Sequence, residues 1–178
     1  MSSPQELRKI RLKADYKEMC NIRGKVVQWK AVRGEPPYVE EYELFIKVRT
    51  IINNKPEYRD EQHVTVNLPE SYPIDAPQVR MKYMDRPFHV NWYKDGSWCY
   101  GLWNFSEGLG HHIIRMIRTF QFDPEITNEA SHTCNDAKKF YTNKSNKGLF
   151  PCDKTQLPDP SKSRFEVQSV SQKTFRIN

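Results

Sequence analysis

The chain has 178 residues, of which 37% are apolar and 12% aromatic, which is enough for one sizeable core and too little for two. A formal net charge of +6 favours an acidic partner but does not choose between protein and nucleic acid. The first twenty residues lack the apolar run of a signal peptide, and nowhere do eighteen uncharged apolar residues follow one another. We therefore expect a cytoplasmic protein with no membrane partner.

The first predicted element is a helix over about residues 4–21. Ser3 can cap it, Pro4 suits the first helical position, and Glu6 can complete a capping box. Apolar positions at helical spacing alternate with many basic ones, and the basic surface is either a solvated face or a docking surface. The apolar positions are Leu7, Ile10 and Ala14, and the basic ones are Arg8, Lys9, Arg11, Lys13 and Lys17.

Alternating apolar and polar residues then predict strands. The alternation is strong over residues 42–48 and 64–68 and weaker over 25–33 and 78–83. The sequence NNK at 53–55 supplies a plausible hairpin turn between the two strong strands. We expect a meander of four antiparallel strands.

No period holds from Pro87 to Phe105, which predicts a long ordered loop packed by its own aromatic side chains. Ser106 can cap a second helix that ends near Asp123. One stripe of this helix is expected in the core, namely Leu109, Ile113, Met116, Ile117 and Phe120.

A short third helix is expected over about residues 132–143, with Ala137, Phe140 and Tyr141 facing inward. Residues 144–178 then read as a polar tail with several prolines, partly disordered or partner-binding. Within this tail, the sequence RFEVQSV at 164–170 could add an edge strand or await a partner.

The order of helix, four-stranded meander, long loop and further helices belongs to the α+β class. Two segments make the chain resemble a known family. NLPESYPIDAPQVRM resembles the part of ubiquitin-conjugating enzymes where a strand ends, a Tyr-Pro turn follows and a second proline precedes the next strand. HVN resembles that family's His-Pro-Asn motif, and DGSWC fits its turn before the cysteine, eight positions after the asparagine. The matching residues are Tyr72, Pro73, Pro77, His89, Asn91 and Cys99.

The resemblance implies a ubiquitin-conjugating-enzyme-like fold with a catalytic domain over residues 1–143 and a cysteine nucleophile at Cys99. Cys99 would accept the C-terminus of a ubiquitin-like modifier from an activating enzyme as a thioester, then pass it to an acceptor amine, with lysine expected. No cofactor or metal is required, and a ligase is an optional further partner. A free thiol is only a few per cent thiolate at neutral pH, but sulfur displaces sulfur almost isoenergetically, so no strong base is needed.

The other residues receive roles by the same resemblance. Asn91 either donates its amide to the oxyanion, where one donor can contribute roughly 3 kcal/mol, or braces the loop that does. His89 is expected to be structural, and Asn128 stands where the family often has an acidic residue that activates the acceptor lysine. Tyr72, Pro73 and Pro77 would form a rigid scaffold beside the site, because proline fixes φ and removes a backbone donor. Lys9, Arg11 and Lys13 would meet an acidic surface of the activating enzyme.

The chain also departs from the motif. Val90 stands in place of proline, Tyr100-Gly101 replaces Leu-Asp, and the stretch before the second helix is short. In these features it resembles divergent bacterial relatives, which belong to ubiquitin-like conjugation operons, some of them antiphage.

Three alternatives remain. One is a catalytically inactive variant of the same fold that acts as a binding module, although Cys99 in register argues against it. Another is a basic nucleic-acid-binding protein, but no base-reading motif is present, so nucleic acid is not expected as a partner. The third is a zinc enzyme, whose usual ligand spacings are absent from the candidate ligands His111, His112, His132, Cys134 and Cys152.

Overall fold

The computed structural model describes residues 3–131 and 133–162. The first helix, α1 (Pro4–Ile22), begins at the predicted capping box. The backbone N–H of Glu6 donates to Ser3 Oγ at 3.2 Å, and the backbone N–H of Ser3 donates to the Glu6 carboxylate at 2.7 Å. The predicted helix start is therefore confirmed at the level of individual hydrogen bonds.

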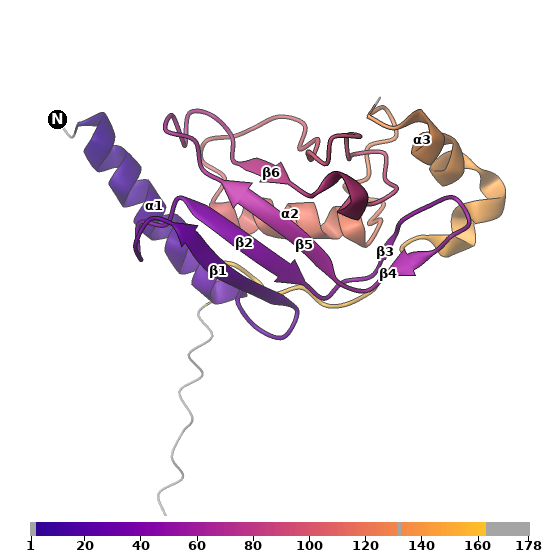
Figure 1. Ribbon diagram of the computed structural model, residues 1–178, viewed down its shortest axis with the longest axis horizontal. Helices are drawn as coiled ribbons and strands as arrows, with labels where there is room; N and C mark the ends of the chain where they lie inside the picture. Colours follow the sequence, from indigo (N-terminus) through magenta and orange to yellow (C-terminus); the bar gives the residue numbers. More distant parts are fainter. Residues whose placement is uncertain (1–2, 132, 163–178) are drawn as a thin grey trace, which may run out of the picture.

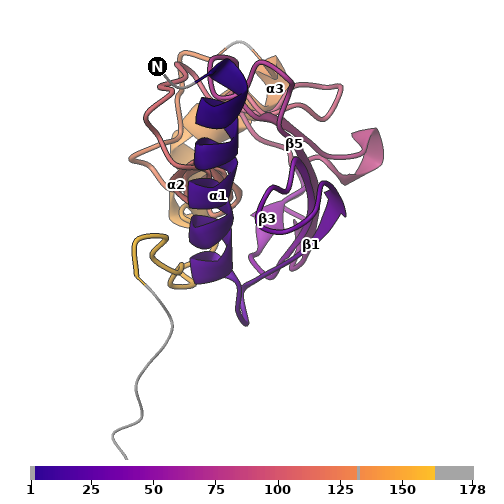
Figure 2. The ribbon, with the colours of Figure 1, turned by 90° about the vertical axis from the view of Figure 1, so that its left-hand side faces the viewer.

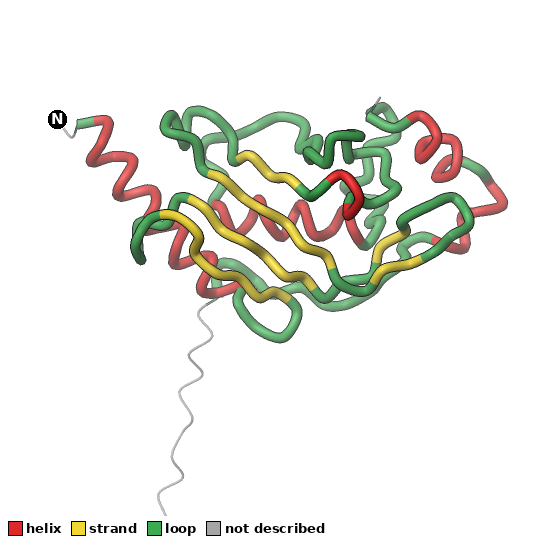
Figure 3. Tube along the Cα trace, in the orientation of Figure 1, coloured by secondary structure: helices red, strands yellow, loops and turns green. Residues whose placement is uncertain are grey.

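The predicted four-stranded meander is also confirmed. Strands β1 (Val27–Arg33), β2 (Glu41–Ile46), β5 (Gln62–Asn67) and β6 (Gln78–Arg80) form one antiparallel sheet in the order β1-β2-β5-β6 (Figures 1 and 3). Burial alternates along each central strand, so one face of the sheet lies on the core. On that face Leu44 is paired with Trp29 on one side and with Val64 on the other.

A second, two-stranded sheet lies between the two strong strands. It consists of β3 (Thr50–Ile51) and β4 (Tyr58–Arg59). The predicted turn at 53–55 is present, with Asn53 Oδ1 accepting from the backbone N–H groups of Lys55 and Glu57. The turn closes this extra hairpin instead of joining β2 directly to β5, because the chain leaves the main sheet after Ile46.

The helices α1 and α2 (Leu109–Phe120) lie on the same face of the sheet (Figure 2). The predicted stripe of α2 is confirmed: its five apolar side chains are fully buried. The predicted cap is wrong, because the N-cap is Gly108, and Ser106 instead donates to Asn104. Carboxylates of α1 take the role of the cap, with Asp15 accepting from Leu109 N at 2.8 Å and Glu18 from Gly110 N at 2.9 Å. Asp15 and Glu18 lie more than 90 residues earlier in the chain, beyond the reach of a local capping rule.

The buried face of α1 differs from the expected one. Leu7 and Ile10 are 56% and 63% exposed, and Ala14 is exposed as well. The buried residues of α1 are Leu12, Asp15, Met19, Asn21 and Ile22. Asp15 turns this face inward because its carboxylate binds the N-terminus of α2.

The C-terminal part of the described chain wraps around the domain. Helix α3 (Asn135–Thr142) and the short helix η2 (Lys144–Leu149) lie at the opposite end of the molecule from the start of α1 (Figure 1). Ala137 is buried, whereas Phe140 and Tyr141 are half-buried.

The described part of the predicted tail packs on the domain. The backbone N–H of Cys152 donates to the Gln121 carbonyl at 2.9 Å, and Asn21 donates to the Pro160 carbonyl at 2.7 Å. The strand predicted at 164–170 lies outside the described residues. In residues 3–131 and 133–162 no helix is both long enough and apolar enough to cross a membrane.

Candidate active site

A tight turn after the last strand positions the chain that leads to Cys99. β6 is followed by the short helix η1 (Tyr83–Asp85) and then by the irregular segment 87–105. In the Asp95-Gly96 turn, the Asp95 carboxylate accepts from Ser97 N at 2.9 Å, and Gly96 adopts φ +85°. A Cβ at Gly96 would lie 2.0 Å from the Met81 carbonyl oxygen, so only glycine fits this approach to the chain after β6.

Beyond the turn, two segments of backbone hold Cys99. The N–H of Trp98 donates to the carbonyl of Val79 in β6, and the N–H of Cys99 donates to the carbonyl of Asn91 at 2.8 Å. The Cys99 side chain is partly exposed and lines a cleft of about 130 Å³. The other lining residues of this cleft are Asn91, Trp98, Tyr100, Gly101, Arg115, Thr119, Ile126 and Asn128.

The structure thus brings all three candidate catalytic residues, Cys99, Asn91 and Asn128, to one cleft. Asn91 is buried, and its side-chain oxygen accepts from Asn128 N at 3.0 Å while its amide nitrogen lies 3.5 Å from the Asn128 carbonyl. This pairing braces the loop after α2, which is one of the two roles expected for Asn91. Asn128 itself is exposed, and its side-chain oxygen accepts from Ala130 N.

His89 is enclosed within the protein, as a structural role would require. Its Nδ1 accepts from Asn91 N at 2.9 Å, and its ring lies against Phe122, with 4.3 Å between ring centroids. Burial lowers the pKa of His89 to about 3, so the imidazole is neutral at physiological pH. His89 therefore fixes the backbone that leads to Asn91.

Val90 connects the segment 87–105 to the C-terminal helix. Its side chain is fully buried against Cys134 and Ala137, and Phe88 packs beside them. Its carbonyl also accepts a hydrogen bond from Thr133 Oγ1. An apolar side chain at this position joins the active-site loop to α3.

The Tyr-Pro segment forms a second support beside the loop. The hydroxyl of Tyr72 donates to Asp15 at 2.6 Å, and the Pro73 carbonyl accepts from Trp103 Nε1 at 2.8 Å. Burial, chiefly, raises the pKa of Tyr72, which keeps its hydroxyl protonated as a donor. Pro77 is buried immediately before β6.

The three basic residues expected to bind a partner do not share one environment. Lys9 and Lys13 are exposed on α1. Arg11 is turned inward, where it donates to Asp15 at 2.8 Å, to the Tyr72 hydroxyl at 2.9 Å and to the Glu107 carbonyl. Arg11 is thus part of the framework, and its assignment to a docking surface is corrected. Its i, i+4 spacing from Asp15 was the signal in the sequence.

Two residues near Cys99 had no assigned role in the sequence. Tyr93 lies close to the sulfur, and a hydrogen bond with the Cys99 thiol raises the pKa of this tyrosine. Arg115 of α2 lines the cleft and donates to the Tyr100 carbonyl at 2.6 Å. Tyr93 could have been noticed as a hydroxyl within the motif, whereas Arg115 is brought near only by the fold.

The remaining cysteines have different surroundings from Cys99. Cys134 is buried, and burial raises the pKa of Cys152 to about 12. Cys20 is exposed on α1 and does not line the cleft. The candidate zinc ligands His111 and His112 instead contact Glu18 and Glu107, respectively.

No family model matches the chain, and no curated protein matches it. Solved structures similar to it include that of human ubiquitin-conjugating enzyme E2 G1, with 15% sequence identity and a TM-score of 0.49. The likeness covers 65% of this chain and 95% of that chain. The α+β architecture stands on the helices and the sheet order themselves, which are those that the sequence resemblance implied.

Proposed function

We propose that the protein is a conjugating enzyme for a ubiquitin-like modifier and that Cys99 carries the modifier as a thioester. The observation that carries the proposal is the shared cleft: a partly exposed thiol opens on it beside Asn91 and Asn128. This arrangement comes on top of two sequence segments in register with the family motif. The departures within those segments support a place among divergent bacterial relatives.

The first step is an exchange between two sulfur atoms. The Cys99 thiolate attacks the thioester carbonyl of the modifier on the activating enzyme, a new C–S bond forms, and the activating enzyme's cysteine leaves as a thiolate. In the second step an acceptor amine, which we propose is that of a lysine side chain, attacks the new thioester and loses a proton while the Cys99 thiolate leaves. Each step passes through a tetrahedral oxyanion.

Asn91 and Asn128 would act on opposite sides of this reaction. Asn91 is already hydrogen-bonded to the backbone of Asn128, so its first role is to brace the loop, and an oxyanion role would require its amide to turn towards the cleft. Asn128 is a neutral group at the mouth of the cleft, where it could orient the acceptor amine. A free lysine has a pKa near 10.4, so its deprotonation would depend on desolvation beside the thioester.

The proposal is tested by isolating the protein from its own cells with an acid quench and without reductant. Wild type should contain a form several kilodaltons heavier by intact mass, and a thiol should remove the added mass. Cys99→Ser should carry the adduct as an oxyester that resists thiols, and Cys99→Ala should lose it. Cys20→Ser is the matched control, because Cys20 is exposed but lies away from the cleft. An adduct that persists in Cys99→Ala would refute the proposal, and wild type without an adduct would favour the inactive binding module.

We also propose that the exposed side chains of Lys9 and Lys13 meet the activating enzyme. The double variant Lys9→Glu, Lys13→Glu should fold normally but accumulate the adduct more slowly at low salt, because charge steering acts on association. Lys17→Glu, on the same helix, is the control for a general change in charge. Equal adduct formation by the double variant and wild type would exclude this surface.

A further inference from the structure

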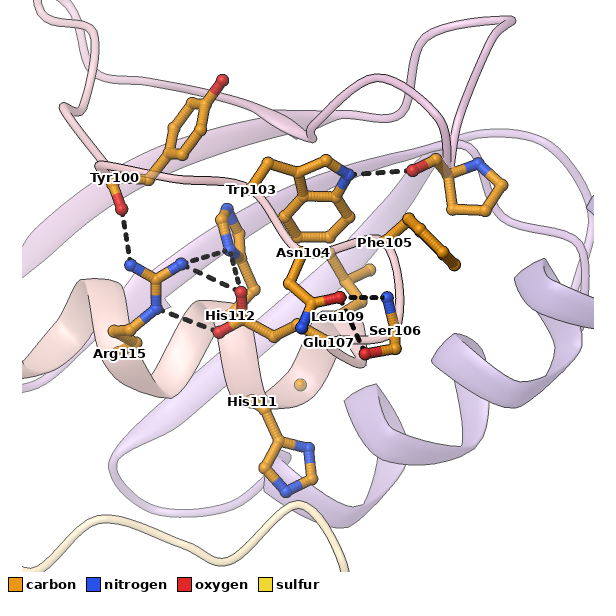
Figure 4. A network of polar contacts seen from close by, with 12 residues as sticks. Tyr100, Trp103, Asn104, Phe105, Ser106, Glu107, Leu109, His111, His112 and Arg115 are labelled. Carbon is orange, nitrogen blue, oxygen red and sulfur yellow. Dashed lines mark hydrogen bonds and ion pairs between the residues drawn. The ribbon is translucent and has the colours of Figure 1, made fainter.

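Arg115, in the middle of α2, contacts both chain neighbours of Cys99. Its guanidinium lies over the Trp98 ring, with Cζ 5.2 Å from the ring centroid. Its Nη1 donates to the carbonyl oxygen of Tyr100 at 2.6 Å (Figure 4). One cation therefore touches the residue before and the residue after the candidate nucleophile.

The remaining donors of Arg115 are held by Glu107, at the far end of the segment 100–107. Nε and Nη2 donate to the two carboxylate oxygens at 2.9 Å each, a bidentate geometry that fixes the plane of the guanidinium. Burial by itself raises the pKa of Glu107, but hydrogen bonds from His112 and Arg115 outweigh burial and lower the pKa to about 2. Glu107 is thus ionised at neutral pH and holds Arg115 in place.

His112 gives this ion pair a rigid base. The imidazole is fully buried, with Nδ1 3.3 Å from the Glu107 carboxylate and its ring 4.9 Å from that of Trp98 and 5.0 Å from that of Trp103, centroid to centroid. The same Nδ1 lies 3.2 Å from Arg115 Nη2, so the imidazole contacts both members of the ion pair, while Nε2 has no partner among the described residues. Figure 4 shows the cluster between α2 and the segment that follows Cys99.

The stretch that Arg115 holds has little other support. In the described part of the chain, the only hydrogen bond to the backbone of residues 100–102 is the one from Arg115 to Tyr100. Leu102 is 95% exposed, and Gly101 is exposed with φ +76°. Apart from the Tyr100 ring, which packs against the core, the backbone of this stretch is held by Arg115, so it should become more mobile once that hydrogen bond is lost.

We propose that Arg115 is a positioning residue for the acyl transfer at Cys99, an inference that rests on the function proposed above. By stacking on Trp98 and holding the Tyr100 carbonyl, it fixes the backbone on both sides of Cys99 and aims the thiol into the cleft. Glu107 orients Arg115 in turn, and α2 is the rigid support. Arg115 acts through these neighbours and does not itself touch the reacting carbonyl.

The test compares Arg115→Met, Arg115→Lys and Glu107→Gln with wild type. Arg49→Met is the matched control, since Arg49 also pairs with a carboxylate, that of Asp60 beside β4. The first measurement is hydrogen–deuterium exchange of the amides of Trp98 and Cys99, which donate to the carbonyls of Val79 and Asn91. The second is the rate at which acetyl-Gly-Gly benzyl thioester acylates Cys99, followed by peptide mass with Cys20 as the internal reference. In this reaction the Cys99 thiolate displaces benzyl thiolate, so no partner protein is required.

In Arg115→Met, exchange of the Trp98 and Cys99 amides should rise roughly tenfold, the effect of losing one charge-assisted hydrogen bond, and acylation of Cys99 should slow relative to Cys20. Arg115→Lys should restore only part of the amide protection and part of the acylation rate. An ammonium cannot donate two hydrogen bonds to the Glu107 carboxylate while it also donates to the Tyr100 carbonyl. Arg49→Met should match wild type in both measurements.

Unchanged exchange of the Trp98 and Cys99 amides in Arg115→Met would overturn the proposal, and so would faster exchange with an unchanged rate of Cys99 acylation. If a thermal melt shows that Arg115→Met does not fold, the same two measurements on Glu107→Gln test the role of Arg115. This variant keeps the guanidinium but removes the carboxylate that orients it. A wild-type protein that carries no adduct in cells would refute the proposed function. The exchange and acylation rates would still test the role of Arg115, because neither needs a partner protein.

Discussion

The two sides of Cys99 are built differently. The preceding segment, residues 89–99, is closed by backbone hydrogen bonds, such as the one from Tyr93 N to the Ser97 carbonyl, and its aromatic side chains Trp92 and Trp98 are buried. The following segment, residues 100–107, is held mainly by side chains that come from α1 and α2. The candidate nucleophile thus lies where a self-contained turn meets a stretch that depends on distant residues for its shape.

The largest difference between the two sides should appear when an aromatic side chain is removed from each. Trp92 is buried, stacks on Phe120 and donates to Thr119 Oγ1 at 3.0 Å. Trp92→Ala should lower the free energy of unfolding by about 3–5 kcal/mol. Phe105 is 68% exposed, so Phe105→Ala should change it by less than about 0.5 kcal/mol. Urea denaturation of both variants measures the difference, and similar losses would mean that the two segments are equally packed.

Gly96 and Gly101 lie on the two sides of Cys99, and both have a positive φ. Gly96 has both a positive φ and a backbone oxygen in the way of a Cβ, so Gly96→Ala should cost about 2–3 kcal/mol of unfolding free energy. Gly101 has a positive φ with open space around it, so Gly101→Ala should cost only about 1 kcal/mol. Chemical denaturation of the two alanine variants checks the order, and an equal cost would show that the contact with Met81 is not fixed in solution.

Acid should weaken the two sides in different pH windows. Because burial lowers the pKa of His89 to about 3, the unfolded chain takes up a proton below about pH 6.5 that the folded protein refuses. Stability linked to His89 is therefore complete above pH 6.5 and falls between pH 6.5 and 3. His89→Gln should reduce the pH slope of the unfolding free energy by about 1.4 kcal/mol per pH unit between pH 4 and 6. An unchanged slope in that window would place His89 in contact with solvent.

On the other side, Glu107 has a pKa lowered to about 2, against an ordinary value near 4.5. The stability that its ion pair contributes is complete above about pH 4.5 and is lost as the pH falls towards 2. The deficit of Glu107→Gln relative to wild type should be constant from pH 7 to 5 and shrink below pH 4. A difference in unfolding free energy between Glu107→Gln and wild type that begins to shrink near pH 6 would contradict the ion pair between Glu107 and Arg115.

How much could be predicted from the sequence follows the same division. The capping box of α1, the strand pattern and the Asp95-Gly96 turn are local, so spacing alone predicted them. Cys99, Asn91 and Asn128 were found through motifs whose residues lie close together in the chain. The cap of α2 by Asp15, the buried face of α1 and the position of Arg115 all depend on side chains brought together by the packing of α1 and α2, and no local pattern encodes them.

Arg11 shows the limit most clearly. Arg11 is a basic residue on a largely basic helix, as a docking residue would be. In the structure, however, its guanidinium joins α1 to Tyr72 and to the segment 100–107. Of Lys9, Arg11 and Lys13, only Arg11 lies four positions before a carboxylate, that of Asp15, and this spacing was the one local sign of its different role. The contacts of Arg11 with Tyr72 and Glu107 depend on the fold.

The proposed role of Cys99 is tested most directly by locating the residue that carries the acyl group. In Cys99→Ser isolated from its own cells, the ester survives digestion, and tandem mass spectrometry can locate the C-terminal remnant of the modifier. We expect the remnant on the peptide that contains position 99, at that residue. A remnant on Cys20, on a lysine or on any other residue, with position 99 unmodified, would contradict it.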